Sequence, residues 1–135
     1  MSINVVLNPD APPDHLYVLE VAEALAEAVR VLNHQTRHHG ALESPEDADV
    51  VVSALATMAH RLPQLLDQVG RWLEAEEAAG RLEVTSGKFA GRPGAVANAV
   101  RILLDAAAAR FREAERLLES AHQVTGAMAP AGEGS

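Results

Sequence analysis

The stretch that decides the fold is residues 44–79, which read SPEDADVVVSALATMAHRLPQLLDQVGRWLEAEEAA. Ser44 has the side chain of a helix N-cap, Pro45 suits the first helical position, and Glu46 and Asp47 meet the positive end of the helix dipole. Apolar residues then recur at alternating intervals of four and three, which places them on one helical face. They are Ala48, Val52, Leu55, Ala59, Leu62, Leu66, Val69 and Leu73. The pattern predicts one long helix over 45–79.

Pro63 interrupts this helix chemically without changing the phase of the apolar pattern. A proline inside a helix removes one backbone hydrogen bond and clashes with the carbonyl four residues earlier, here that of Ala59. We therefore expect a kink in one continuous helix. A break into two helices at Pro63 is the alternative.

The same spacing recurs on both sides of this stretch. Upstream, Val18, Ala22, Leu25, Val29 and Leu32 predict a helix over 14–39, which Gly40 ends. Downstream, Val96, Val100, Leu103, Ala107, Phe111, Ala114, Leu118 and Ala121 predict a helix over 93–124. Three long helices indicate an all-α fold, an up-down-up antiparallel bundle in a single domain over 1–125, with four helices if the second breaks at Pro63.

The remaining segments connect or flank these helices. Residues 1–13 contain three prolines and form an extended N-terminal arm, because the residue before a proline is driven toward extended geometry. Residues 80–94 contain four glycines and form the main loop, in which 81–85 can pair with the arm as a short strand. The tail over 126–135 is small and polar, and we expect it to be disordered.

Composition narrows the classes of protein. The chain has 135 residues and no cysteine, 48% of it is hydrophobic and 3% aromatic, and its formal net charge is -8. A disulfide scaffold and thiolate chemistry are therefore excluded. No signal peptide or membrane-spanning run is evident, so we expect a cytoplasmic protein with no membrane partner. Ten arginines against one lysine, with 26 alanines, are typical of a GC-rich bacterial coding sequence.

The charge is unevenly distributed. Residues 1–79 carry a net charge of -9, residues 80–112 carry +4, and the remainder carries -3. The candidate side chains for an anion or nucleic-acid site are Arg81, Lys88, Arg92, Arg101 and Arg110. The alternative is that this basic loop folds against the acidic first two helices of its own chain or of a partner, since GKFAGRPG lacks the pattern of a P-loop.

Candidate partner-binding residues lie on the first two helices. Trp72 adjoins Leu73 of the apolar pattern, so it belongs to the core edge or to an interface, where aromatic residues contribute much of the binding energy. Glu20, Glu23 and Glu27 form an acidic ladder off the apolar face of the first helix. The simpler interpretation is that these three glutamates form a solvated face of the helix.

His34 and His38 share one face at the end of the 14–39 helix, in the spacing of a metal-chelating pair. The alternative is that they complement the negative end of the helix dipole. The motifs of zinc proteases and di-iron bundles are absent, and we predict no cofactor and no catalytic residues.

The leading functional hypothesis is therefore a non-enzymatic helical bundle that acts through protein–protein contact. A thin, alanine-rich core favours its association as a homodimer. The alternatives are a nucleic-acid accessory protein that uses the basic 81–112 region and, more weakly, a metal- or small-molecule-binding bundle that uses His34 and His38.

Overall fold

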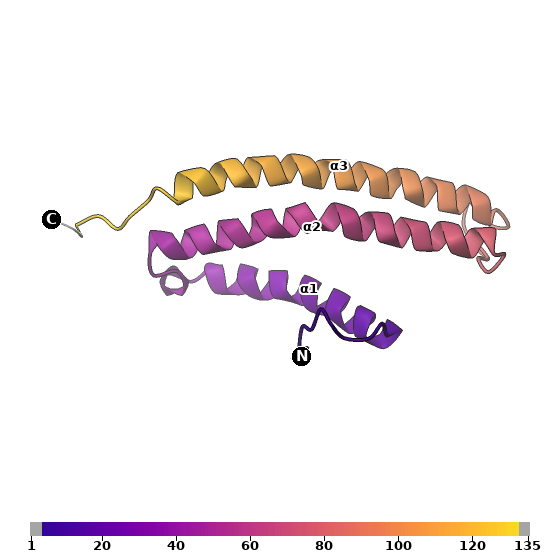
Figure 1. The fold of residues 1–135 in the computed structure, drawn as a ribbon, viewed down its shortest axis with the longest axis horizontal. Coiled ribbons are helices and arrows are strands. Elements are labelled where there is room, and N and C mark those ends of the chain that lie inside the picture. Colours follow the sequence, from indigo (N-terminus) through magenta and orange to yellow (C-terminus); the bar gives the residue numbers. More distant parts are fainter. Residues whose placement is uncertain (1–3, 133–135) are drawn as a thin grey trace. The chain divides into compact units, whose positions relative to one another are not determined.

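The computed structural model describes residues 4–132, and these are helical apart from their ends and connections (Figure 1). The helices are α1 (His15–Thr36), α2 (Pro45–Ala78) and α3 (Pro93–Thr125), with a short 3-10 helix, η1 (His39–Ala41), between the first two. No strand occurs in residues 4–132. The predicted all-α fold with three long helices is confirmed, and two residue ranges, 1–3 and 133–135, lie outside the description.

The helix boundaries follow local chemistry. Asp14 caps α1, its Oδ1 accepting a hydrogen bond from the Leu16 amide at 3.3 Å. At the other end α1 stops at Thr36, three residues before the predicted end at His39, and η1 replaces the last predicted turn. Ser44 does precede α2, but its side chain makes no capping hydrogen bond. Pro45 and the acids of the first turn are therefore the features that mark this start.

Pro63 lies inside α2, which continues unbroken from Pro45 to Ala78. The alternative of a fourth helix is therefore wrong. Proline at this position leaves the Ala59 carbonyl without its usual backbone partner. The ring itself is buried. Burial of an apolar ring in the contact between helices offsets part of the cost of the missing hydrogen bond.

The loop between α2 and α3 satisfies its own backbone. Gly80 adopts a φ of 73°, and the amide of Arg81 bonds the Glu76 carbonyl while that of Gly80 bonds the Glu77 carbonyl. This pair of bonds is a Schellman motif, which glycine favours because a positive φ costs it nothing. Further on, the Gly91 amide bonds the Val84 carbonyl at 2.8 Å. The predicted strand over 81–85 is wrong, because these bonds close the loop upon itself.

The chain divides into two compact units, Met1–Glu43 and Ser44–Ser135. In the first, the N-terminal arm is tied to α1 by Tyr17. The Tyr17 hydroxyl donates to the Val6 carbonyl at 2.6 Å and accepts from the Asn8 amide at 2.9 Å. Residues 4–13 are irregular, with a turn at Pro9 and Asp10. The predicted single domain over 1–125 stays a prediction.

The second unit is an antiparallel hairpin of α2 and α3, which lie side by side along their length (Figure 1). The residues buried along it are small or compact. They are Ala56, Ala59, Pro63 and Gly70 on α2, and Ala97 and Ala108 on α3. We call this contact the small-residue seam. Ala56 and Ala59 are 1% and 2% exposed, so the predicted thin, alanine-lined core is observed.

The seam is rotated relative to the predicted apolar pattern. On α2, the predicted Leu55, Leu62 and Val69 each come one residue before a seam position. Only Ala59 among the buried residues of α2 belonged to the predicted pattern. Small side chains occupy the contact because they let two helix backbones approach closely. The larger residues remain beside it.

The seam predicts a size limit that two nearby alanines can test. Ala56 is buried in the seam, whereas Ala54 is exposed. Replacing Ala56 with leucine should lower the free energy of unfolding by about 1–3 kcal/mol, because the packed seam has no room for the added carbons. Ala54→Leu should change it by less than about 0.5 kcal/mol. Urea unfolding followed by circular dichroism measures both, and equal effects would contradict the seam.

Candidate interaction surface

The two sides of the hairpin differ in chemistry. Two antiparallel helices are related by a two-fold axis perpendicular to both, so positions directly before the seam fall on the same side of both helices. Positions directly after it fall on the other side. On α2 the seam residues are preceded by Leu55, Met58, Leu62 and Val69 and followed by Thr57, His60, Gln64 and Arg71. One side of α2 is therefore apolar and the other polar.

The apolar side of the hairpin is defined here by two stripes. On α2 it consists of Val51, Leu55, Met58, Leu62, Leu65, Val69 and Trp72, and on α3 of Val96, Ala99, Leu103, Ala107, Arg110, Ala114, Leu117 and Ala121. Several of its largest side chains are exposed, including Trp72 at 61%, Leu103 at 68% and Leu117 at 72%. Exposed apolar residues gathered in one stripe are typical of a binding surface.

Ion pairs with α3 keep negative charge off the apolar side of α2. From Ala48 to Ala75 the helix contains three acidic residues, Asp49, Asp67 and Glu74. Each of them contacts a cationic or titratable side chain of α3: His122 for Asp49, and Arg101 for the other two. Because no acid is left for the apolar side over these eight turns, water solvates that side poorly.

The predicted partner-binding residues lie in different places. Trp72 lies on the apolar side, and its exposure excludes it from the hairpin core. Leu73 is half-buried beside it. Glu20, Glu23 and Glu27 follow one face of α1, where the first two are exposed and Glu27 is bound by Arg30. The hydrogen bond from Arg30 lowers the pKa of Glu27. Glu20 and Glu23 are therefore solvated, and a role of the three glutamates in binding a partner stays a prediction.

The polar side of the hairpin is hollowed near its middle. A groove of about 460 Å³ is lined by His60, Pro63, Gln64, Asp67, Asp105, Ala108 and Arg112. Residues that follow seam positions on both helices line this groove. This agrees with the two-fold relation between the helices, which places such residues on the same side of the hairpin. Across one end of it, Nδ1 of His60 lies 2.6 Å from a carboxylate oxygen of Glu115.

Arg101 holds the half of the hairpin nearer the loop. Its guanidinium donates to the Asp67 carboxylate at 2.6 Å and to the Asp67 carbonyl at 3.2 Å, and it approaches Glu74 and Asp105 at 3.3 and 3.4 Å. It crosses α2 at Gly70, where a Cβ atom would come within 2.6 Å of Nη1. A side chain at position 70 would therefore displace the Arg101 guanidinium from this crossing.

A second polar cluster joins the other end of the hairpin. Oδ1 of Asp49 accepts a hydrogen bond from the Thr125 hydroxyl and lies 2.8 Å from Nδ1 of His122. The Thr125 hydrogen bond is the main cause of a lowered pKa for the Asp49 carboxyl, and His122 lowers it further. Sequence spacing did not point to this cluster, because its members are more than 70 residues apart in the chain.

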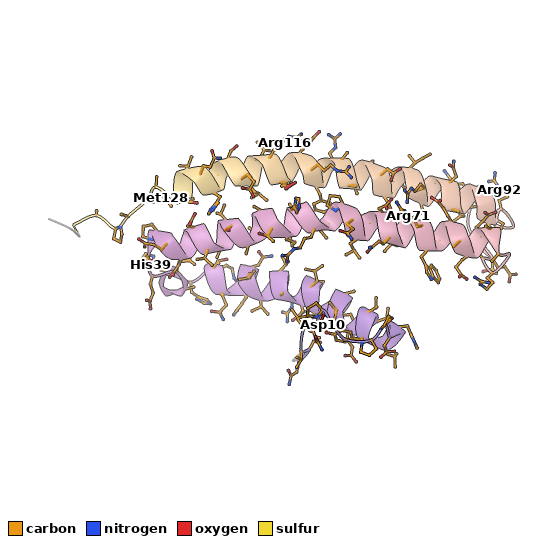
Figure 2. All side chains as sticks on the ribbon, in the orientation of Figure 1. Asp10, His39, Arg71, Arg92, Arg116 and Met128 are labelled. Atoms are coloured by element: carbon orange, nitrogen blue, oxygen red, sulfur yellow. The ribbon has the colours of Figure 1, made fainter. Side chains whose placement is uncertain are left out.

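The predicted basic site is dispersed. Arg81 is bound by Glu76, Arg101 by the acids of α2, and Arg110 by Glu113. Lys88 and Arg92 make no ion pair within residues 4–132. They flank the Phe89 ring at 5.2 and 5.5 Å from its centre, and Arg92 lies at the loop end of the hairpin (Figure 2). Three of the six basic residues of the 81–112 region therefore meet carboxylates of their own chain, two of them on α2.

The predicted histidine pair is an exposed contact at the end of α1. The rings of His34 and His38 stack edge to face with centroids 5.4 Å apart, and Nδ1 of His34 lies 2.7 Å from an Arg37 guanidinium nitrogen. In the described part of the chain, no three side chains of histidine, aspartate or glutamate gather as metal ligands would.

Comparison of the chain with protein-family models, with curated proteins and with solved structures finds no match. None of the helices within residues 4–132 combines the length and the apolar character that crossing a bilayer requires.

The Arg101 contacts predict unequal effects of two arginine substitutions on α3. Arg101→Met removes contacts with three carboxylates and a hydrogen bond to the Asp67 carbonyl, whereas Arg110→Met removes one exposed pair. We expect Arg101→Met to lower the urea midpoint clearly and Arg110→Met to leave it nearly unchanged, because exposed ion pairs contribute little. Similar midpoints for the two variants would show that Arg101 does not clamp the hairpin.

The Asp49 cluster predicts a pH dependence with a defined sign. Its lowered pKa means that the ionised carboxylate stabilises the fold at neutral pH and that this contribution disappears as the pH falls through the lowered value, below the ordinary value of about 3.9. Asp49→Asn should therefore be less stable than the native chain at pH 7, with the difference shrinking below about pH 4. Urea midpoints across this range measure it, with Glu119→Gln as an exposed control.

Proposed function

We propose that this protein is a non-enzymatic, cytoplasmic interaction module that acts through protein–protein contact and self-associates, with the apolar side of the α2–α3 hairpin as its contact surface. The observation that carries the proposal is the separation of the hairpin into a polar side and an apolar side whose two stripes contain no acidic residue. The large apolar residues beside the packed seam stay in contact with water unless another protein surface packs against them.

Three further features support this function. The apolar side contains an exposed tryptophan, the residue type most enriched among dominant interface contacts. The hairpin offers it on long, regular helices, so that little conformational entropy is lost when a partner docks. The polar clusters of Arg101 and Asp49 fix α3 on α2 from both ends of the hairpin, which keeps the surface preformed.

No observation favours the alternatives to the same degree. A nucleic-acid site needs cations available to phosphate, and three of the five candidate side chains are engaged with carboxylates. The metal alternative has His34 and His38 alone on an exposed helix end. We therefore propose neither of them.

Sedimentation velocity over a wide concentration range tests the proposal. We expect concentration-dependent association of the native chain and its loss in Val69→Glu, because a carboxylate on the apolar side would be buried without a partner. Gln64→Glu, on the polar side of the same helix, should associate like the native chain. A native chain that stays monomeric throughout would refute self-association.

The single tryptophan gives an independent readout. Trp72 is 61% exposed in the isolated chain, so its emission should shift to shorter wavelength as the protein concentration rises and the apolar side is covered. The shift should be absent in Val69→Glu. An unchanged emission maximum in samples that sedimentation shows to be associated would place the contact elsewhere.

A further inference from the structure

The two stripes of the apolar side differ in side-chain size. Along α2 the heptad series Val51, Met58, Leu65 and Trp72 consists of large residues. The α3 stripe contains alanine at positions 99, 107, 114 and 121. A surface with large residues on one helix and small ones on the next can be complementary to itself, provided that the two stripes are exchanged between two copies.

Contacts within the hairpin fix which residues stand at the same height. Asp49 meets His122, His60 meets Glu115, and Gly70 meets Arg101. The residue numbers in such pairs have nearly constant sums, as an antiparallel pair requires. This register places four residues of α2 at the heights of four alanines of α3: Val51 with Ala121, Met58 with Ala114, Leu65 with Ala107, and Trp72 with Ala99. Every member of this series thus stands level with an alanine. The intervening Leu55, Leu62 and Val69 stand level with Leu117, Arg110 and Leu103, so the match of large with small residues holds at alternate positions of the stripe.

A two-fold axis parallel to the helices would use this match. It places α2 of one copy over α3 of the other, antiparallel and at unchanged height, with both loops at the same end. The alternative axis, perpendicular to the helices, places α2 over α2 and sets large residues against large ones. We infer that the apolar side binds a second copy of this chain, with α2 of each copy over the alanine-containing stripe of α3 of the other. The result is an isologous dimer whose interface consists of four helices, two from each copy.

The available area is of the right size. The exposed parts of Leu65, Val69, Trp72, Leu103 and Leu117 amount to on the order of 600 Å² of surface, against about 800 Å² per partner in a standard interface. The half-buried neighbours Leu55, Leu62 and Ala107 lie between them and add to this area. Arg110 lies in the α3 stripe, but its guanidinium is exposed and bound by Glu113, so it can stay at the rim.

This inference rests on the proposed self-association, and cysteine pairing separates the two. The chain has no cysteine, so every disulfide formed after substitution is informative. Met58→Cys and Ala114→Cys are prepared as separate single variants, mixed in equal amounts and oxidised. We expect most of the protein to form a mixed disulfide dimer, because the two positions come level across the dimer.

Two controls make the outcome decisive. Thr57→Cys mixed with Arg116→Cys tests the same height on the polar side, where both residues are exposed and Arg116 lies away from α2 (Figure 2). This mixture should form only traces of dimer. Leu65→Cys with Ala107→Cys is a second pair on the apolar side, which covers the case that Met58→Cys destabilises the hairpin.

The possible results are distinguishable. Mixed disulfides in both apolar pairs support the arrangement. A dimer by sedimentation that instead forms disulfides within Met58→Cys alone, or in the polar control, overturns the arrangement and leaves self-association standing. A chain that neither sediments as a dimer nor forms mixed disulfides overturns both.

Discussion

The structure of the hairpin depends on the size of the side chains between α2 and α3. Alanine, glycine and one proline are the residues buried in the contact, and each fills so little space that two helices can approach closely. This closeness has a cost, because few carbon atoms are removed from water per turn. The hairpin consequently depends on interactions outside its seam. On the polar side these are the clusters around Arg101 and Asp49. On the apolar side we propose that a partner buries the exposed apolar residues.

The polar clusters serve the hairpin at separate points along its length. Near the loop, Arg101 reaches across Gly70 and gathers three carboxylates, and at the far end Asp49 gathers a hydroxyl and an imidazole. Between them His60 meets Glu115. These contacts fix the register of the two helices, because the small side chains of the seam interlock too little to fix it alone. They also gather the acids of α2 toward α3, so that the apolar side stays free of negative charge.

Local chemistry predicted the elements well and their packing less well. Pro45, Gly80 and Pro93 mark helix boundaries that the structure reproduces within a residue, because each acts on its own stretch of backbone. The seam was harder to predict, because a hydrophobic pattern gives most weight to the largest residues, whereas the closest contact selects the smallest. The long-range clusters were not predictable, since nothing in the spacing of Asp49 or Arg101 identifies a partner on another helix. Arg101 was accordingly read as a candidate anion ligand, although its charge is used inside the hairpin.

The heptad repeat of the seam also constrains how such a chain can change length. Ala56, Pro63 and Gly70 are seven residues apart, so deleting one residue from α2 would turn everything beyond it by about 100° and bring the polar residues that follow the seam, such as Gln64 and Arg71, into the contact. Deleting seven residues would preserve the face, but only if α3 lost the same number at the same height. The hairpin can therefore grow or shrink over evolutionary time in matched steps of two turns on both helices, while insertions of any length are tolerated in the loop between them.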